Sequence, residues 1–449
     1  MSQNSMTNAL AGTRWGRRSF LGAMGAASAA GLAGCNLAPN SGGGGGGKGG
    51  TLNVWGGVPA ENGPQALCDA FTEANPDVKV TYTRYPNDDT GNLKLDSSLA
   101  GGAPIDVFIS YAPAKLFQRV SNGLAVDLTE RIDADPDLKQ FGTTAESPSN
   151  YFSDGKAFSV PAQKSPTIVV LNQTMLDKAG IKLGDSWTYE DFESVAKELS
   201  GDGVYGSFNA LTKAGIVLGP DRYYADGGER SNFDHPIFAE DLQHRLDEQD
   251  AKHCMDRKTI LAEKLETFAH TPFLTNRAAM HASQIFILRY IADTKEFPHD
   301  FITKAMPHPT VEPGGDEWGV GAIGDNVSIS SKASDPDLAW EFVRFWMLNG
   351  QYNVPGGRLP SVVGNATPQE LVASLLGEQR EELFDVPSFE NALFGKEVTI
   401  PVDTIFTAAS ELDEMVEKRT DEVLLGTRSV ESWVETMTKD ADAAIAAAK

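Results

Sequence analysis

Apolar residues recur along the chain at two spacings, that of strands and that of helices. Residues 51–55 (TLNVW) alternate apolar and polar positions, and residues 78–82 (VKVTY) alternate again. Between them, residues 64–75 place apolar side chains on one face of a helix, which an Asn-Pro pair ends. Residues 105–109 (IDVFI) are almost continuously apolar, which is typical of a strand buried on both faces. This order of elements predicts an α/β fold with a mostly parallel sheet.

A second α/β region follows the first. The apolar run at residues 168–171 predicts another buried strand, and Thr188, with Asp191 three residues later, is the predicted N-cap of an amphipathic helix. Strand patterns return near residues 301–307 and 320–330. Further helices are predicted after Asp335-Pro336 and from Thr404 onward, whereas residues 222–258 are too polar to assign with this pattern. The chain of 449 residues is too long for one ordinary core, so more than one lobe is expected.

The N-terminal segment has a different pattern. Adjacent arginines, Arg17 and Arg18, precede a run of small and apolar residues from 20 to 34, and Cys35 follows. An apolar run behind positive charge predicts an export signal, and it is shorter than the roughly 20 apolar residues that a spanning helix needs. An ordinary signal with a chance cysteine and a short anchor helix are the alternatives. Residues 41–50 (SGGGGGGKGG) predict a flexible tether, and Gly49 stands where a phosphate loop needs Ser or Thr.

This segment resembles two known export signals. Leu-Ala-Gly-Cys, ending at Cys35, is similar to the lipobox of bacterial lipoproteins, and the segment from Arg17 to Leu21 is similar to a twin-arginine signal. The resemblance implies that residues 1–34 are removed, that Cys35 is lipidated, and that residues 35–50 tether the protein to the extracytoplasmic face of the cell membrane.

Composition and charge narrow the possible partners. The chain carries a formal net charge of -24 and is 41% hydrophobic, as expected of a folded globular protein. Such an acidic surface repels phosphate backbones and anionic lipid heads, so we expect no nucleic acid partner and membrane contact through the lipid anchor alone. Cys68 and Cys254 show no CxxC spacing, and we expect them to be unpaired buried side chains.

The order of the segments resembles a known family. TLNVWGG, FTEANPDVKVTY, LAGGAPIDVFIS, GKAFSVPAQKSPTIVVLNQTMLDKAGI, SWTYEDFESVAKEL, FLTNRAAM and LLGTRSVESWVETMTKDADAAI are similar to segments of extracellular solute-binding proteins of ABC importers, in the sugar-binding group that includes maltose-binding protein. The resemblance implies a type II periplasmic-binding-protein fold, in which ligand binds in a cleft between two α/β lobes. It places residues 51–161 and 295–331 in the first lobe and residues 162–294 and 332–449 in the second, with the boundary near residues 229–262 open.

Candidate ligand-binding residues follow the predicted strands, where loops enter the cleft. Trp55 ends the first strand and Tyr111 follows IDVFIS; core packing is the alternative for both. Gln163, Lys164 and Ser165 lie where the resemblance implies a crossing between the lobes, and a solvated loop is their alternative.

The remaining candidates come from the second half of the chain. Relatives usually carry Gly-x-Trp after the segment that matches Arg277–Met280, and Gln284 and Phe286 stand there in this chain. The resemblance also implies cleft roles for Trp318, Asp325 and Asn326 of EWGVGAIGDN, and Arg358 of GGRLP is a further candidate. Arg358 is predicted to donate to a hydroxyl or an anion, with a surface salt bridge as the alternative.

Other kinds of site have little support in the sequence. The seven histidines lie between residues 235 and 308, but no HxxH or HExxH motif occurs, and we expect neither a metal nor another cofactor. Tyr223-Tyr224 resembles the paired tyrosines of iron-binding relatives, and helix packing explains this pair equally well. No GxSxG elbow is present, and no pair of carboxylates is singled out for glycoside hydrolysis, so we expect a binding protein and not an enzyme.

These expectations combine into one functional hypothesis. The chain is expected to be a lipid-anchored monomer that closes around a neutral mono- or oligosaccharide and delivers it to the permease subunits of an ABC importer. Aromatic rings suit the apolar faces of sugars, and amides pair with hydroxyl groups. A phosphorylated polyol, held by Lys164 and Arg358, is the alternative ligand. A secreted enzyme that acts on glycosides is the other alternative.

Overall fold

The computed structural model describes residues 49–146, 149–315, 317–364, 366–397 and 399–449. The predicted signal, Cys35 and the tether up to residue 48 lie outside these ranges. The predicted tether runs to residue 50, but strand β1 begins at Gly50, so the folded part starts slightly earlier than expected. In the described part of the chain, no helix has the length and apolar character needed to cross a bilayer.

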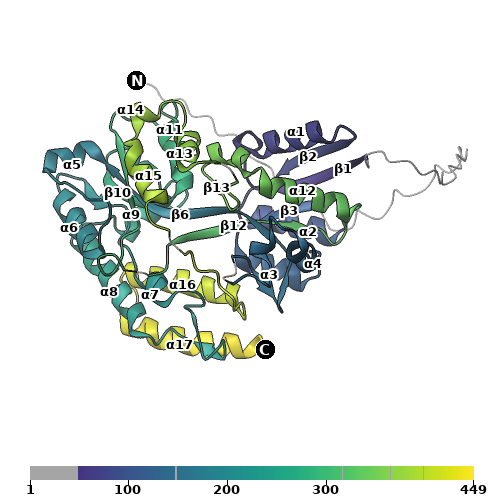
Figure 1. Ribbon diagram of the computed structural model, residues 1–449. Helices are drawn as coiled ribbons and strands as arrows, with labels where there is room; N and C mark the ends of the chain where they lie inside the picture. The colour runs from purple at the N-terminus through teal and green to yellow at the C-terminus, as the bar shows by residue number, and fades with distance from the viewer. Residues whose placement is uncertain (1–48, 147–148, 316, 365, 398) are drawn as a thin grey trace, which may run out of the picture. The chain divides into compact units, whose positions relative to one another are not determined.

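One long strand joins two lobes. β6 (Val160–Asn172) pairs through its first half with β12 (Gly321–Ile329) and through its second half with β10 (Ala278–Gln284) and β11 (Thr303–Pro307). Figure 1 shows β6 and β12 running side by side through the middle of the folded part. The predicted strand at residues 168–171 is therefore the second half of a longer crossing strand.

The first lobe is built on a sheet with the order β2, β1, β3, β12 and β6. Its other strands and its helices are β1 (Gly50–Gly56), β2 (Val78–Arg84), β3 (Val107–Ser110), α1 (Pro64–Ala74), α2 (Asp89–Ala100), α3 (Pro113–Ser121), α4 (Thr129–Ala134) and α12 (Pro336–Leu348). Short pieces complete this lobe: η1 (Ala60–Asn62), η2 (Lys139–Phe141), and the hairpin of β4 (Phe152–Ser153) and β5 (Lys156–Ala157). All four residues of β3 are buried, as the continuous apolar run predicts.

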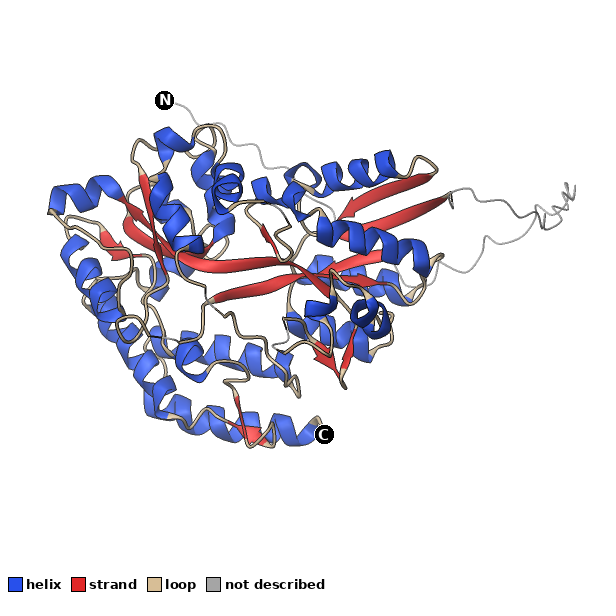
Figure 2. Ribbon diagram, in the orientation of Figure 1, coloured by secondary structure: helices blue, strands red, loops and turns tan. Residues whose placement is uncertain are grey.

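The second lobe continues the same sheet from β6 through β10 to β7. Its elements are α5 (Gln173–Ala179), α6 (Tyr189–Leu199), β7 (Tyr205–Ser207), α7 (Ala214–Leu218), β8 (Tyr224–Ala225), β9 (Arg230–Ser231), α8 (Pro236–Asp250), α9 (Arg257–Ala262), α10 (Thr271–Leu274), η3 (Ile285–Ile287), α11 (Leu288–Ala292), η4 (Gly350–Gly356), β13 (Leu359–Pro360), α13 (Pro368–Leu376), α14 (Arg380–Leu383), α15 (Val386–Phe394), α16 (Ala409–Leu424) and α17 (Val430–Ala447). Figure 2 shows helices on both sides of the strands. The polar stretch that the sequence pattern left unassigned contains α8.

The sheet is mixed, where a mostly parallel sheet was predicted. β1 is parallel to β2 and β3, and β10 is parallel to β7. β12, however, is antiparallel to β3 and β6, and β6 is antiparallel to β10. The reason is that the chain passes from the first lobe to the second along β6 and returns along β12, so these strands run in opposite directions.

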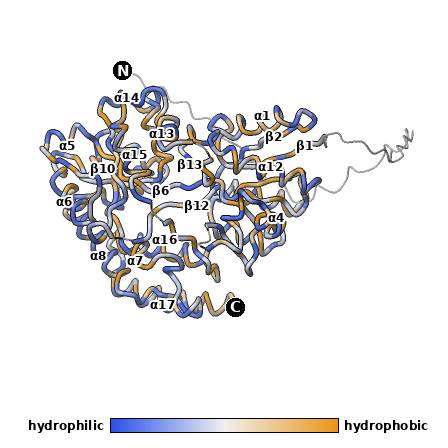
Figure 3. The backbone as a smooth tube through the Cα atoms, viewed as in Figure 1, coloured by the Kyte–Doolittle hydropathy of each residue, from blue (hydrophilic) through white to orange (hydrophobic). Residues whose placement is uncertain are grey.

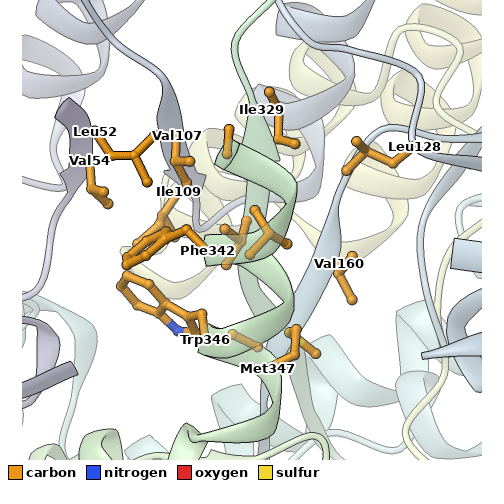
Figure 4. Packing of buried hydrophobic residues seen from close by; sticks show 14 of the residues in the cluster. Leu52, Val54, Val107, Ile109, Leu128, Val160, Ile329, Phe342, Trp346 and Met347 are labelled. Atoms are coloured by element: carbon orange, nitrogen blue, oxygen red, sulfur yellow. The ribbon is translucent and has the colours of Figure 1, made fainter. Parts of the chain in front are cut away.

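Core packing groups two elements differently from the predicted lobe boundaries. The prediction assigned residues 332–449 to the second lobe, yet Phe342 and Trp346 of α12 pack in one buried cluster with Val54 and Ile109 of the first lobe (Figure 4). β11 was predicted in the first lobe but pairs with the second half of β6. Both results follow from connectivity: β11 precedes β12 and is still in the second lobe, whereas α12 directly follows β12, which returns the chain to the first lobe.

Helix ends agree with the capping signals in the sequence. Thr188 and Asp191 form a capping box at the start of α6, and Asp335 accepts hydrogen bonds from the first turn of α12. Hydrophilic and hydrophobic residues both occur along α6 (Figure 3), and its buried residues share one face, as in an amphipathic helix. Cys68 and Cys254 are buried and unpaired, as expected.

Candidate functional site

A cavity of about 730 Å³ lies between the two lobes, over the crossing strands. Its first-lobe wall follows the carboxyl ends of β1, β2 and β3, and its second-lobe wall follows the end of β10. The carboxyl ends of strands are where ligands bind in open α/β sheets. The lining includes the side chains of Arg84, Asn87, Tyr111, Gln163, Ser165, Gln284, Phe286, Arg289, Tyr290, Asp293, Asp325 and Arg358.

The crossing strands place polar side chains on the cavity face. Gln163 and Ser165 lie two residues apart on β6 and both line the cavity, because side chains in a strand alternate between its faces. The buried Oε1 of Gln163 has no hydrogen-bond partner among the described residues. Because buried polar atoms are normally paired, this acceptor favours a ligand that donates hydrogen bonds, such as a hydroxyl group.

Tyr111 supports the first-lobe wall. Its hydroxyl oxygen accepts hydrogen bonds from the backbone N–H of Gly57, at 2.6 Å, and of Val58, at 3.3 Å. Burial raises the pKa of Tyr111 well above its ordinary value, so the hydroxyl stays protonated. A Cβ atom at Gly57 would lie 2.9 Å from the Tyr111 ring, so the close approach requires glycine. Tyr111 therefore lines the cavity and also fixes the loop that follows β1.

Asp325 and Arg358 form an ion pair at the base of the cavity. The Nε of Arg358 donates to Asp325 Oδ2 at 2.9 Å, and its Nη1 donates to the carbonyl oxygen of Gly356 at 3.0 Å. Asp325 is 4% exposed. Burial raises the pKa of Asp325, and the guanidinium of Arg358 opposes that rise. The surface salt bridge considered for Arg358 is instead a largely buried pair.

An exposed aromatic ring marks the second-lobe wall. Phe286 is 41% exposed and lines the cavity beside Gln284, at the end of β10. One turn later, the guanidinium carbon of Arg289 lies 4.8 Å from the ring centroid of Tyr290 and 5.8 Å from that of Phe286. The Nη2 of Arg289 donates to the Tyr290 hydroxyl at 2.8 Å. These contacts place an aromatic face and a cation next to each other.

A smaller cavity of about 300 Å³ shares Phe286 and Tyr290 with the main one. His281 of β10 and His270 line it, and the ring of His270 stacks on Tyr290 with centroids 3.9 Å apart. Burial lowers the pKa of His281 to about 3, and it also lowers the pKa of His270. His281 is therefore neutral at physiological pH.

Seven of the predicted residues come together around the main cavity. They are Tyr111, Gln163, Ser165, Gln284, Phe286, Asp325 and Arg358. The geometry makes these residues neighbours, although they span both halves of the chain.

Four predicted residues lie elsewhere. Trp55 packs against a second buried cluster of the first lobe, which includes Leu95 and Leu99 of α2, and Lys94 Nζ lies 5.6 Å from its ring centroid. Lys164 lies between Gln163 and Ser165 on β6, on the opposite face of the strand, and so does not line the cavity. Trp318 lies against Gly219, and Asn326 is fully buried in β12. Lys164 is thus badly placed to hold a phosphorylated ligand in this cavity.

Sequence reasoning missed several lining residues that simple rules would find. Arg84 and Asn87 come at and just after the end of β2, where the rule that selected Tyr111 also applies. Arg289 and Tyr290 lie three and four residues after Phe286, a spacing that puts side chains on one side of a helical turn. Among the described residues, no group of three or more His, Cys, Asp or Glu side chains is arranged to hold a metal ion.

Comparisons with known proteins agree with this geometry. Residues 59–352 match the model of a family described as bacterial extracellular solute-binding protein. A search of curated protein sequences gave no significant match.

Solved structures share the fold. A sugar transporter from Rhizobium etli in an open conformation has a TM-score of 0.69 and 18% identity, over 89% of this chain and 100% of that one. An ABC substrate-binding protein from Listeria monocytogenes, in complex with cycloalternan, gives the same four values. The sugar-binding protein MalE from Xanthomonas citri has a TM-score of 0.66 and 16% identity, over 88% and 98%. The chain therefore has the two-lobed α/β fold of solute-binding proteins.

Proposed function

Because the chain belongs to the family of bacterial extracellular solute-binding proteins, we propose that it binds a carbohydrate in the cleft between its lobes. The observation that carries this proposal is the lining of the cavity. The exposed ring of Phe286 offers a flat apolar face, while Gln163, Ser165 and Gln284 offer donors and acceptors for hydroxyl groups. Related structures that are named as sugar transporters or hold a saccharide support the same ligand class.

We further propose that the protein hands this carbohydrate to an ABC importer and remains attached to the cell membrane. Similar structures are named as a sugar transporter and an ABC substrate-binding protein, and the family and fold are those of binding proteins, not enzymes. The twin arginines at Arg17 and Arg18 and the Leu-Ala-Gly-Cys sequence ending at Cys35 support export and lipidation. The protein would then act on the extracytoplasmic face as a monomer.

A thermal-shift screen against a carbohydrate panel tests the proposed ligand class. A ligand that binds the folded state alone stabilises it by about 2.7 kcal/mol at a hundredfold excess over Kd. We expect at least one carbohydrate to raise the Tm and to be recovered unchanged after incubation with the protein. Stabilisation by no member of the panel would contradict the proposal, and release of shorter sugars would indicate an enzyme.

A further inference from the structure

The charged side chains that line the main cavity do not cancel. Three guanidinium groups, those of Arg84, Arg289 and Arg358, face two carboxylates, those of Asp293 and Asp325. The whole chain carries a formal charge of -24, so an excess of positive charge in the cleft runs against the average of the protein. Local charge of this sign attracts anions.

One of the three arginines is already neutralised. Arg358 is paired with Asp325 at 2.9 Å, and both side chains are largely buried, so this pair belongs to the framework of the cleft. Two guanidinium groups are left, one from each lobe.

Arg84 supplies positive charge from the first lobe. It ends β2, and its Nε donates to the carbonyl oxygen of Gly57 at 3.3 Å, which holds the side chain against the cavity wall. Within the described residues, no carboxylate lies within ion-pair distance of it. Its terminal nitrogens are therefore available to a ligand.

Arg289 supplies positive charge from the second lobe. Its guanidinium lies over the Tyr290 ring and beside Phe286, and no described carboxylate pairs with it. Asp293, four residues later, has its Oδ1 occupied as an acceptor for the backbone N–H of Glu296, at 3.2 Å. Stacking on an aromatic ring fixes the plane of a guanidinium, which then presents paired N–H donors.

We propose that the cleft takes a carbohydrate that carries a carboxylate group, such as a uronic acid residue, with Arg84 and Arg289 as its charged contacts. This inference rests on the proposed function and names its ligand class more closely. Guanidinium and carboxylate groups match in geometry and form charge-assisted hydrogen bonds, which are stronger than bonds to neutral hydroxyls. The sequence predicts a neutral sugar because Lys164 and Arg358 are the only cations in the predicted cleft loops. In the structure, Arg84 and Arg289 also line the cavity, whereas Lys164 does not.

Titration calorimetry with matched pairs of sugars tests the inference. Glucose is compared with glucuronate, and galactose with galacturonate and its di- and trisaccharides, in about 0.05 M and about 0.5 M NaCl, where charge screening differs strongly. We expect an acidic sugar to bind at least about tenfold more tightly than its neutral parent at low salt, which corresponds to about 1.4 kcal/mol. High salt should reduce that preference.

Single substitutions assign the preference to the two arginines. Arg84→Gln and Arg289→Gln should each lower the ratio of acidic-sugar to neutral-sugar affinity, because only the acidic sugar loses a charge-assisted contact. Arg131→Gln and Arg380→Gln are matched controls, since they remove one positive charge from each lobe at exposed ion pairs outside the cavity. Circular dichroism and Tm confirm that each variant is folded.

The outcomes separate the two proposals. If neutral sugars bind as tightly as uronates, the carboxylate inference is wrong and the carbohydrate function stands. If hexose 6-phosphates bind more tightly than uronates, the assignment to carboxylates is wrong. If no neutral or acidic carbohydrate binds, the proposed function itself fails.

Discussion

The ring of Phe406 stacks on the ring of Phe117, with centroids 3.6 Å apart and planes 15° from parallel. Phe117 belongs to α3 of the first lobe, whereas Phe406 precedes α16. Asp221 of the second lobe accepts hydrogen bonds from the backbone N–H groups of Thr404, at 2.6 Å, and Ile405, at 2.8 Å. The stacked rings therefore join the two lobes away from the crossing strands, and hinge opening would separate them.

Removing this contact should favour the open form. An aromatic pair contributes about 0.5–1.5 kcal/mol, so Phe406→Ala should shift the closed-to-open ratio by a few-fold to about tenfold. We expect a larger radius of gyration for the ligand-free variant in small-angle scattering, and greater compaction when a saturating carbohydrate is added. Phe268→Ala, which truncates an exposed ring of the second lobe, is the control. An unchanged radius of gyration in Phe406→Ala would show that the stack does not hold the lobes together.

The ion pair of Asp325 and Arg358 gives a stability prediction. Arg358→Ala leaves a buried carboxylate without its cation, and breaking such a pair costs about 3–5 kcal/mol. Asp325 already has a raised pKa through burial, and losing Arg358 raises that pKa further. When the pKa of a carboxyl group is higher in the folded than in the unfolded protein, the free energy of unfolding falls as pH rises through the folded pKa. Urea unfolding should therefore show a larger loss at neutral pH than at acidic pH.

The double variant Asp325→Asn with Arg358→Gln is the control for this pair. It removes both charges and leaves neutral hydrogen-bonding groups, so it should recover part of the lost stability. A loss in Arg358→Ala that is the same at all pH values would contradict the role given to the Asp325 charge.

His281 predicts a pH dependence of the opposite sign from the same cause, burial. Burial lowers its pKa to about 3, whereas the unfolded chain binds the proton near the ordinary value of 6.5. At pH values above the unfolded pKa, His281 is neutral in both states and the stability is fully present. As pH falls below the unfolded pKa, the unfolded chain takes up the proton and the free energy of unfolding drops by about 1.4 kcal/mol per pH unit. His281→Gln should flatten the dependence of unfolding free energy between roughly pH 6 and pH 4. Equal slopes in wild type and His281→Gln would contradict this explanation.

How far the sequence predicts this protein can be judged from single residues. The elements of the first lobe, the capping box at Thr188 and the N-cap at Asp335 follow from local patterns, because spacing and side-chain hydrogen bonds act within a few residues. The positions of Lys164 and α12 depend on long-range pairing. Lys164 faces away from the cavity because β6 turns the side of the strand that carries Gln163 and Ser165 toward it. α12 packs on the first lobe because β12 leads the chain back to that lobe. No local pattern encodes these facts.

Local sequence patterns also predict the candidate site only in part. Tyr111 and Phe286 were found from strand ends and from the family resemblance, and both line the cavity. Trp55 also ends a strand, yet its ring lies on the face that α2 covers, beside Lys94. Which face of a strand is covered by a helix depends on tertiary packing, so the same rule gave different outcomes for Trp55 and Tyr111.

The proposed anchor depends on one cysteine. Cys35→Ala should leave the protein as an unprocessed precursor or release it from the membrane, because the lipidated thiol is then missing. Cell fractionation followed by immunoblotting measures this, and a serine substitution at the buried Cys68 controls for general effects of losing a cysteine. Normal membrane retention of Cys35→Ala would contradict lipidation at this residue.

Binding at Phe286 tests the central claim most directly. The sugar found by screening is titrated calorimetrically into wild type, Phe286→Ala and the control Phe268→Ala, which truncates an exposed ring outside the cavity. If a carbohydrate stacks on Phe286 in the cleft between the lobes, Phe286→Ala should lose about 1–3 kcal/mol of binding free energy, and Phe268→Ala should bind as wild type does. Equal affinity of wild type and Phe286→Ala for that sugar would contradict the proposed site.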